Sequence, residues 1–222
     1  MLVIFDLDGT LLDTIDDLAQ AANAALVSCG LPARTVEECR QFVGNGVSKL
    51  LERAVPKTAR TPEVLAAMHT AFFAYYDVHL TDKTRPYPGI ETLLNALQRR
   101  GVKLAVASNK YQRATERLIK HFFPRISFVA VLGQRENIPE KPHPQIVQDI
   151  LTAAHETPEN TLYVGDSDVD MQTAQNAGVK ACGVTWGFRS RETLAAYRPY
   201  ALVDEPSAIL LLPIVKQHNG CA

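Results

Sequence analysis

The sequence has no marked excess of charge of either sign and no long hydrophobic run. Lysine and arginine number 23 and aspartate and glutamate 24 among 222 residues, so the formal net charge is −1. This balance argues against binding of nucleic acid or of an anionic membrane surface, although a small anionic substrate needs only a local cation. No stretch approaches the roughly 18 apolar residues that a membrane-spanning helix requires.

Cysteine is also scarce. Cys29, Cys39, Cys182 and Cys221 include no Cys-x-x-Cys pair, so the sequence indicates neither a zinc ribbon nor a disulfide framework. No secretory signal is visible, because Asp6 ends the first apolar run before it reaches the length of a signal-peptide core. We therefore expect reduced thiols and a cytoplasmic protein.

Several cofactor and metal motifs are missing. The six histidines, among them His143 and His218, are scattered without a His-Glu-x-x-His pattern. Gly44 and Gly46 lack the third glycine of a dinucleotide-binding fingerprint, and there is no Walker A sequence. Histidine-bound metal, a nicotinamide cofactor and ATP-driven kinase chemistry are therefore not expected.

The first part of the chain predicts one strand followed by helices. Residues 2–5 form a continuous apolar run between polar residues, which is typical of a strand covered on both faces. Apolar residues at helical spacing then recur over residues 14–82. Thr35 and Glu38 have the spacing of a capping box at the start of one of these helices.

After the proline-rich residues 86–89, predicted helices and strands alternate. This alternation predicts an α/β fold with a doubly wound parallel sheet, a Rossmann-like core, into which an all-helical cap is inserted. Residues 1–13 and 83–222 would form the core and residues 14–82 the cap. Residues 208–215 predict a C-terminal helix broken at Pro213. The predicted strands after the first are residues 103–107, 128–132, 161–164, 179–184 and 200–203.

Polar clusters follow three of the predicted strands, and a fourth cluster precedes a predicted helix. Ligands of such sheets bind beyond the carboxyl ends of the strands, so the clusters are expected to converge there. They are Asp6-Leu7-Asp8-Gly9-Thr10, Ser108-Asn109-Lys110, Lys141-Pro142-His143-Pro144 and residues 165–170.

The carboxylates in these clusters indicate a cation site. Asp6 and Asp8 lie two residues apart in an extended segment, so their side chains point the same way and repel unless they share a proton or a cation. Asp166 adds a third carboxylate from another strand end. With no arginine or histidine paired to them, these residues suit a hard divalent ion, most simply Mg²⁺.

The remaining groups suit a phosphoryl ligand. Lys141 is the compact cation expected beside a phosphoryl group, Gly9 permits close approach of the backbone, and Ser108 with the amides around Asn109 would donate from a helix N-terminus. Together with an ionised carboxylate, these groups predict phosphoryl transfer through an aspartyl-phosphate.

The ordered clusters resemble the motifs of the haloacid dehalogenase-like phosphatases, and the helical insertion resembles the C1 cap of that family. The resemblance covers nearly the whole chain. It implies that Asp6 is the nucleophile and a metal ligand, and that Asp8 is the general acid and base and binds Mg²⁺ through its carbonyl. It also implies metal binding by Asp166, phosphoryl binding by Gly9, Thr10, Ser108, Asn109 and Lys141, and support of the metal shell or of Lys141 by Asp170.

Within that family, residues 42–47 and 50–54 are similar to phosphoglycolate phosphatases. Asn45 and Gly46 would meet a substrate carboxylate at a helix start. The expected substrate is a small phosphorylated metabolite, with 2-phosphoglycolate as the leading candidate, and the expected state is a monomer or a homodimer. A β-phosphoglucomutase-like phosphomutase, a pyrophosphatase and a non-catalytic binding or regulatory module are the alternatives. Asp168 is expected to be solvated, and Arg189 has no assigned role.

Overall fold

The computed structural model describes residues 1–216, so His218 and Cys221 lie outside the described residues. The chain divides into two compact units. One unit is Asp13–Arg85, and the other consists of Met1–Leu12 and the residues from Pro86 onward. No helix in residues 1–216 is both long enough and apolar enough to cross a membrane.

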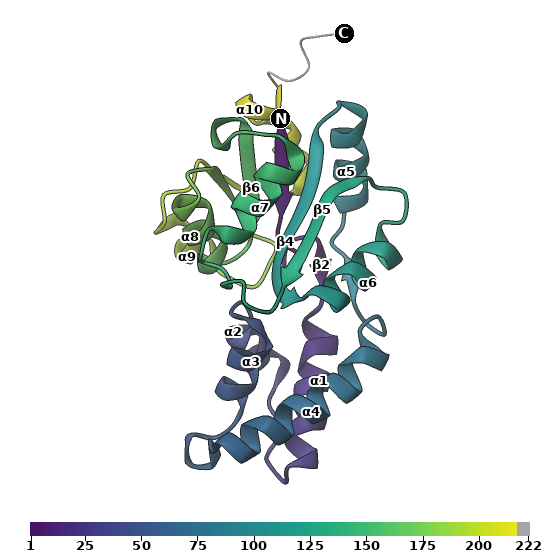
Figure 1. The fold of residues 1–222 in the computed structure, drawn as a ribbon, viewed down its shortest axis with the longest axis vertical. Helices are drawn as coiled ribbons and strands as arrows, with labels where there is room; N and C mark the ends of the chain where they lie inside the picture. Colours follow the sequence, from purple (N-terminus) through teal and green to yellow (C-terminus); the bar gives the residue numbers. More distant parts are fainter. Residues whose placement is uncertain (217–222) are drawn as a thin grey trace. The chain divides into compact units, whose positions relative to one another are not determined.

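The unit that contains Met1–Leu12 and the residues from Pro86 onward is built on a parallel sheet, which confirms the predicted fold class (Figure 1). In the described part of the chain the sheet has six strands in the order β5-β4-β1-β6-β7-β8. Every neighbouring pair is parallel. The strands are β1 Leu2–Phe5, β4 Lys103–Tyr111, β5 Phe128–Gln134, β6 Thr161–Gly165, β7 Lys180–Val184 and β8 Ala201–Val203.

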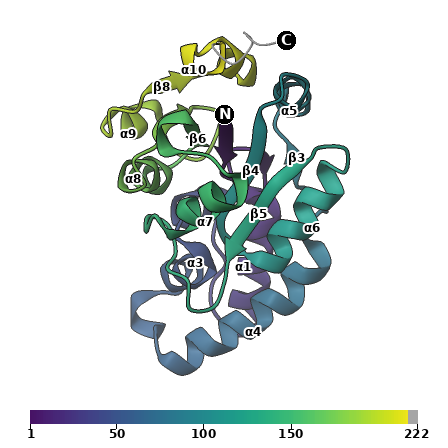
Figure 2. The ribbon, with the colours of Figure 1, turned by 45° about the horizontal axis from the view of Figure 1, so that its top comes forward.

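Helices cover both faces of this sheet, which explains why the first strand is a continuous apolar run. All four residues of β1 are 0% exposed. Side chains of α7, α8 and α9 form one hydrophobic core with alternate strand residues such as Ile4 and Ala105. Figures 1 and 2 show α5 and α6 on the opposite side of the sheet from α7 and α8. The helices are α5 Ile90–Arg99, α6 Gln112–Phe122, α7 Gln145–Ala154, α8 Asp168–Asn176 and α9 Arg191–Ala195.

The register of the central strands levels their carboxyl ends. Phe5 of β1 is paired with Val106 of β4 on one side and with Val164 of β6 on the other. Asp6, the residue after β1, donates its backbone N–H to the Val164 carbonyl at 2.9 Å. The residues that follow Phe5, Val106 and Val164 therefore meet beyond the carboxyl-terminal ends of these three strands.

Some element boundaries differ from the predictions. Strand β4 continues four residues beyond 107 because Tyr111 still pairs with Gln134 of β5, across an irregularity that follows Ala107. Residues 208–215 are not one helix interrupted at Pro213. A 3₁₀ helix, η3 Pro206–Leu211, ends first, and Pro213 occupies the first position of the short helix α10 Pro213–Lys216.

The helical unit contains α1 Ile15–Ser28, α2 Val36–Phe42, α3 Gly46–Ala54, the 3₁₀ helix η1 Lys57–Ala59 and α4 Pro62–His79. The predicted capping box is confirmed: Thr35 Oγ1 accepts from the Glu38 N–H, and the Glu38 carboxylate accepts from the Thr35 N–H. Asp17 of α1 accepts hydrogen bonds from the backbone of Lys83 and Thr84, which fixes the end of the unit to its first helix. Two short strands, β2 Leu12–Asp13 and β3 Arg85–Pro86, pair where the helical segment begins and ends.

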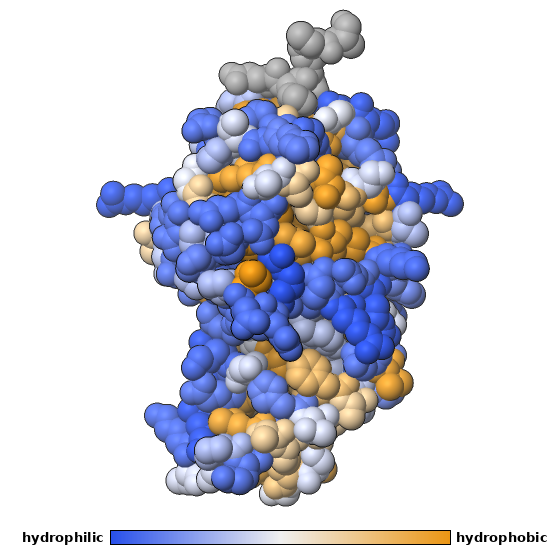
Figure 3. All heavy atoms as spheres, in the orientation of Figure 1, coloured by the Kyte–Doolittle hydropathy of each residue, from blue (hydrophilic) through white to orange (hydrophobic). Residues whose placement is uncertain are grey.

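Hydrophobic side chains also gather on the surface of the α/β unit around β5 (Figure 3). This strand is at an edge of the sheet, and Val129 within it is 43% exposed. The exposure follows from the edge position, because a strand there has no neighbour on one side.

Candidate active site

Asp166 is held rigidly at the end of β6. Its Oδ1 accepts a hydrogen bond from Thr10 Oγ1 at 2.9 Å, and its Oδ2 accepts one from the Phe188 backbone N–H at 2.8 Å. Two glycines leave room for this carboxylate: a Cβ on Gly9 would lie 2.3 Å from Asp166 Oδ2, and one on Gly187 would lie 2.3 Å from Asp166 Cβ. Gly9 also has φ +89, a conformation that favours glycine.

Lys141 connects two further carboxylates. Its Nζ donates to Asp6 Oδ1 at 2.9 Å and to Asp170 Oδ1 at 2.8 Å. The Ala107 carbonyl and the Tyr163 hydroxyl each lie 3.0 Å from the same nitrogen. The Lys141 side chain is 2% exposed, so these oxygens compensate for the loss of water around the ammonium group.

Asn109 and Ser167 fix the two ends of this network. The Asn109 amide accepts from the Lys141 N–H at 2.9 Å and donates to the Lys141 carbonyl at 3.1 Å, so it holds the lysine backbone in both directions. Ser167 caps α8 and donates through Oγ to Asp170 Oδ2 at 2.6 Å. Both oxygens of Asp170 are therefore engaged by the protein.

Asp8 makes a separate ion pair. Its Oδ1 lies 3.2 Å from the Nζ of Lys110, whose side chain is 2% exposed. The pair lies in the same unit as Asp6, with Lys110 on β4 and Asp8 in the loop after β1. The side chain of Asp8 is thus bound to a lysine and does not belong to the group of carboxylates described next.

Asp6, Asp166 and Asp170 form the candidate cation site. Each offers an oxygen within 4.8 Å of the others, and all three residues are buried. Asp6 is the most accessible, at 7% exposed against 1% for Asp166 and 0% for Asp170. Because Asp170 is saturated by Lys141 and Ser167, Asp6 and Asp166 are the better placed to ligate an ion.

The site has an excess of negative charge that burial makes costly. Burial, followed by the charge of Asp170, raises the pKa of Asp6 well above its ordinary value, although Lys141 opposes the shift. Burial and Asp170 likewise raise the pKa of Asp166 to about 7, against the opposing hydrogen bonds from Phe188 and Thr10. Burial alone would lower the pKa of Lys141, but Asp170 and Asp6 raise it well above its ordinary value. A divalent cation would favour the ionised form of both aspartates.

Ser108 and Asn109 do not lie at a helix N-terminus as expected. Both are inside β4, and α6 begins only at Gln112, because the strand continues pairing through Tyr111. Ser108 is 2% exposed and its Oγ accepts from the Lys110 N–H at 3.2 Å. The hydroxyl hydrogen of Ser108 is free to rotate toward a ligand, since this contact uses only an oxygen lone pair.

Asn45 and Gly46 lie in the helical unit. Gly46 is the first residue of α3 and has φ +77, while Asn45 Oδ1 accepts from Arg53 Nη2 at 2.9 Å. The arginine also donates to the Phe42 carbonyl at 2.8 Å, so it fixes the turn before α3. Substrate binding by these two residues stays a prediction.

Asp168 and Arg189 lie beside the carboxylates rather than among them. Asp168 is the first residue of α8, and its Oδ1 lies 3.5 Å from the Arg189 Nε. The charge of Arg189 is one of the smaller influences that lower the pKa of Asp166. Asp168 is therefore paired rather than simply solvated.

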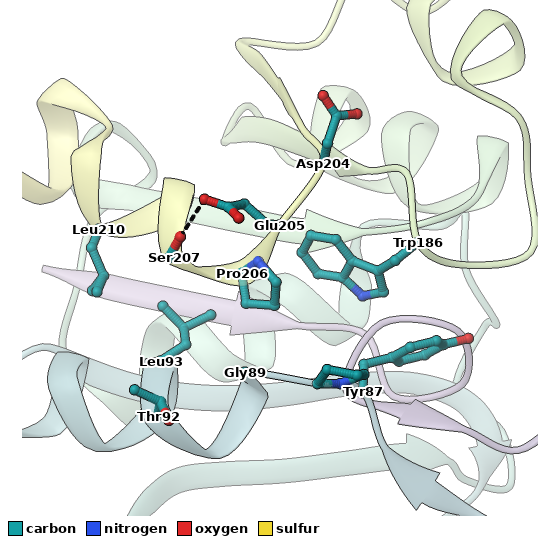
Figure 4. Close-up of a pocket in the computed structure, with 11 residues that line it drawn as sticks. Tyr87, Gly89, Thr92, Leu93, Trp186, Asp204, Glu205, Pro206, Ser207 and Leu210 are labelled. Atoms are coloured by element: carbon teal, nitrogen blue, oxygen red, sulfur yellow. Dashed lines mark hydrogen bonds between the residues drawn. The ribbon is translucent and has the colours of Figure 1, made fainter.

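A cavity of about 490 Å³ lies elsewhere in the α/β unit (Figure 4). Trp186, Pro206 and Leu93 are among its lining residues, and none of the site carboxylates is. Trp186 donates through Nε1 to the Thr10 carbonyl at 3.0 Å, so one wall of the cavity supports the loop that holds Asp166.

The motifs in the sequence predict no role for Tyr163 or Lys110. Tyr163 carries a hydroxyl within a buried strand, and a buried hydroxyl needs a partner, which is a usable signal in the sequence. Lys110 was visible in the cluster with Ser108 and Asn109, but its pairing depends on the irregularity in β4, which nothing local in the sequence indicates.

Comparison with known proteins assigns the chain to a class. Residues 3–184 match the family model described as haloacid dehalogenase-like hydrolase. The chain belongs to this family, as the order and spacing of its motifs indicated.

The chain is also similar to individual proteins and solved structures within this family. The chain is 35% identical to the phosphoglycolate phosphatase of Pseudomonas putida, over 94% of this chain and 78% of that protein. It is 32% identical to the phosphoglycolate phosphatase of Vibrio cholerae, over 96% and 97% of the respective chains. Among solved structures, a predicted phosphoglycolate phosphatase from Haemophilus somnus matches with a TM-score of 0.88 and 31% identity, over 95% of this chain and 96% of that one.

Proposed function

We propose that the protein is a Mg²⁺-dependent phosphatase that hydrolyses 2-phosphoglycolate through a phosphorylated Asp6. Three buried aspartates with a lysine between two of them carry the proposal, since this arrangement combines a carboxylate nucleophile with a lysine and with carboxylates that can hold a divalent cation. The names of the relatives support the substrate, because the P. putida and V. cholerae proteins are both phosphoglycolate phosphatases.

The donor set fits Mg²⁺. Hard oxygen ligands from carboxylates, with room for water and a substrate oxygen, are what this ion prefers. Asp6, Asp166 and the backbone carbonyl of Asp8 would hold it, and Asp170 would stay bound to Lys141 and Ser167. When bound, the ion would neutralise charge on the transferring phosphoryl group.

Asp6 is assigned as the nucleophile because it is the most accessible carboxylate of the three. Lys141 holds Asp6 Oδ1 and orients the carboxylate. In the first step an Asp6 oxygen bonds to phosphorus, the bond to the leaving oxygen breaks, and Asp8 gives that oxygen a proton. In the second step water attacks phosphorus, Asp6 is released, and Asp8 takes the proton from the water.

The remaining groups would position the phosphoryl oxygens. Ser108 has a hydroxyl hydrogen to donate, and Asn109 acts through its two bonds to Lys141. Gly9 and Thr10 would contribute through the shape of the tight loop after β1, in which their backbone N–H groups donate to the Leu12 and Leu7 carbonyls. In the helical unit, Gly46 opens α3, whose first backbone N–H groups have no acceptor within the helix, and Asn45 is oriented by Arg53. These two residues would recognise the carboxylate that distinguishes phosphoglycolate from simple phosphate esters.

The test is phosphate release from a panel of esters, with and without Mg²⁺, by wild type and by Asp6→Asn. We expect release from 2-phosphoglycolate in preference to sugar phosphates and pyrophosphate, loss on chelation, and loss of at least about a thousandfold in Asp6→Asn. Asp149→Asn is the matched control, since Asp149 pairs with Arg135 on the protein surface and lies outside the site. Phosphate moved between sugar hydroxyls without release, or full turnover in Asp6→Asn, would overturn the proposal.

A further inference from the structure

Lys110 is a buried cation with a defined partner. Its side chain is 2% exposed, and its Nζ lies 3.2 Å from Asp8 Oδ1, while the Asp8 side chain is 13% exposed. An ammonium group is expensive to bury without compensation, and a nearby carboxylate is the strongest compensation available. The pair therefore fixes the lysine and the aspartate together.

The backbone of Lys110 is also held in place. Its N–H donates to Ser108 Oγ at 3.2 Å, and its carbonyl accepts from Thr115 Oγ1 at 3.2 Å. A Cβ on Gly133 of β5 would lie 2.5 Å from this carbonyl oxygen, so only glycine lets the two strands approach here. Lys110 lies within the irregular stretch of β4 between Ala107 and Tyr111.

These constraints make Lys110 a rigid support for Asp8. The loop that carries Asp8 is tight: the Leu7 carbonyl accepts from the backbone N–H groups of Leu11 and Leu12. That loop sets the backbone of Asp8. The ammonium of Lys110 acts directly on the carboxylate by binding Oδ1.

We propose that Lys110 is a positioning residue that holds Asp8 for proton transfer. The proposal rests on the proposed function, in which Asp8 protonates the leaving oxygen and later accepts a proton from water. Because the ammonium binds Asp8 Oδ1, the proton that Asp8 gives and later takes is carried on Oδ2, and Lys110 keeps its own protons in both steps. Its effect on phosphorylation of Asp6 should depend on the leaving group, because an alkoxide needs the proton from Asp8 and a nitrophenolate leaves without it.

The test compares kcat/KM for 2-phosphoglycolate and for 4-nitrophenyl phosphate in wild type, Lys110→Met and Lys110→Arg. The ratio kcat/KM reports the steps up to phosphorylation of Asp6. A positioned general acid contributes roughly 10²–10⁴-fold, so a misplaced one should cost the alkyl ester at least about tenfold more than the aryl ester. Lys110→Arg, which keeps the positive charge, should recover part of the kcat/KM for 2-phosphoglycolate that Lys110→Met loses.

The Asp8→Asn background shows whether Lys110 acts through Asp8. There, Lys110→Met should produce no further change in the ratio of the two kcat/KM values, as a double-mutant cycle requires for coupled residues. Lys103→Met is the matched control: Lys103 begins the same strand, is 40% exposed and pairs with Glu156. It should leave the ratio unchanged.

Several results would overturn the inference. Equal losses for both esters would make Lys110 a purely structural residue. A higher KM for 2-phosphoglycolate at unchanged kcat would make it a substrate-binding residue. An additive effect of Lys110→Met in the Asp8→Asn background would show that Lys110 does not act through Asp8.

The outcomes also distinguish failure of this inference from failure of the proposed function. If wild type hydrolyses neither ester, the proposed function fails and this inference fails with it. If wild type is active and Asp6→Asn is inactive, the proposed function is upheld and the ratio decides the inference. If Lys110→Met does not fold, the Lys110→Arg variant decides instead: wild-type kcat/KM for both esters, or a loss that falls mainly on 2-phosphoglycolate, upholds the positioning role, and an equal loss for both esters refutes it.

Discussion

Lys141 is the residue on which the electrostatics of the site depend most. Its ammonium lies between Asp6 and Asp170, and its removal would leave two buried carboxylates without their shared cation. We expect Lys141→Met to lose about 3–5 kcal/mol of unfolding free energy without added metal, as found when one partner of a buried ion pair is removed. Urea denaturation measures this.

Lys103→Met serves as the comparison for that loss. Lys103 is 40% exposed, and pairs of that kind contribute about 0–1 kcal/mol. If the two variants lose equal stability, the buried network around Lys141 does not have the role assigned to it.

Gly187 tests how tightly Asp166 is held. A Cβ at this position would lie 2.3 Å from Asp166 Cβ and 2.4 Å from the Gly9 carbonyl, both fixed groups. Gly187→Ala should therefore displace Asp166, weaken Mg²⁺ binding measured by calorimetry, and lower kcat/KM by at least about tenfold.

Gly101→Ala controls for the cost of replacing a glycine. Gly101 has φ +71 and open space around a Cβ, so its replacement strains the backbone without touching the site. It should lose stability and keep the activity of each folded molecule. Unchanged metal affinity in Gly187→Ala would show that Asp166 tolerates displacement or is not a ligand.

At the scale of the element, a substitution in the capping box of α2 is expected to change the stability of the protein without changing its catalysis. Thr35 and Glu38 satisfy each other's backbone N–H groups at the helix start. Thr35→Ala should cost about 1 kcal/mol of unfolding free energy and leave kcat unchanged. Thr70→Ala, an exposed position within α4, should stay within about 0.5 kcal/mol of wild type. A matching loss in both variants would contradict the role of the cap.

Strand β4 contributes to the site through both its regular and its irregular part. Its regular part, through Ala107, pairs with β1 and β5 and supplies a carbonyl to Lys141. Its irregular part carries Asn109, which fixes the Lys141 backbone, and Lys110, which binds Asp8. A regular strand would point successive side chains to opposite faces of the sheet, so the irregularity is what brings these neighbouring residues to the site.

For the whole molecule, the raised pKa of Asp166 predicts a pH-dependent response to metal. The folded protein without metal keeps a proton on Asp166 up to a pH of about 7, whereas the unfolded chain loses it near 4. The stability that this proton contributes is present at low pH and is lost as the pH rises through about 7. A bound cation favours the ionised form, so the stabilisation by Mg²⁺ should grow as the pH rises.

Thermal denaturation at about pH 5.5 and about pH 8, with and without Mg²⁺, measures this. The rise in Tm caused by Mg²⁺ should be larger at the higher pH, and Asp166→Asn should abolish both the rise and its pH dependence. An equal rise at both values in wild type would contradict the assignment of Asp166 as a ligand.

Much of the fold was predictable because it follows from local patterns. Strand β1 is a short apolar run covered on both faces, and α2 has its own capping box at Thr35. The convergence of the polar clusters followed from the general rule for parallel sheets. The extension of β4 was not predictable, because the pairing of Tyr111 with Gln134 is a tertiary contact between polar residues.

The ion pairs of the site were harder to predict for a related reason. Lys141 was predicted to lie beside the phosphoryl group, but its bond to Asp6, 135 residues earlier, is a tertiary contact that no local pattern indicates. That Asp170 belongs to the carboxylate cluster, and that Asp8 binds Lys110 instead, depends on side-chain directions that only the folded chain defines.

The central claim, a phosphoryl group carried on Asp6, is tested most directly by trapping it. A single turnover of 2-phosphoglycolate with Mg²⁺ is quenched in acid, the acyl phosphate is reduced with borohydride, and the peptides are sequenced by mass spectrometry. The account predicts homoserine at position 6, dependent on both substrate and metal. Modification at another residue, or none at all in an enzyme that turns over, would contradict it.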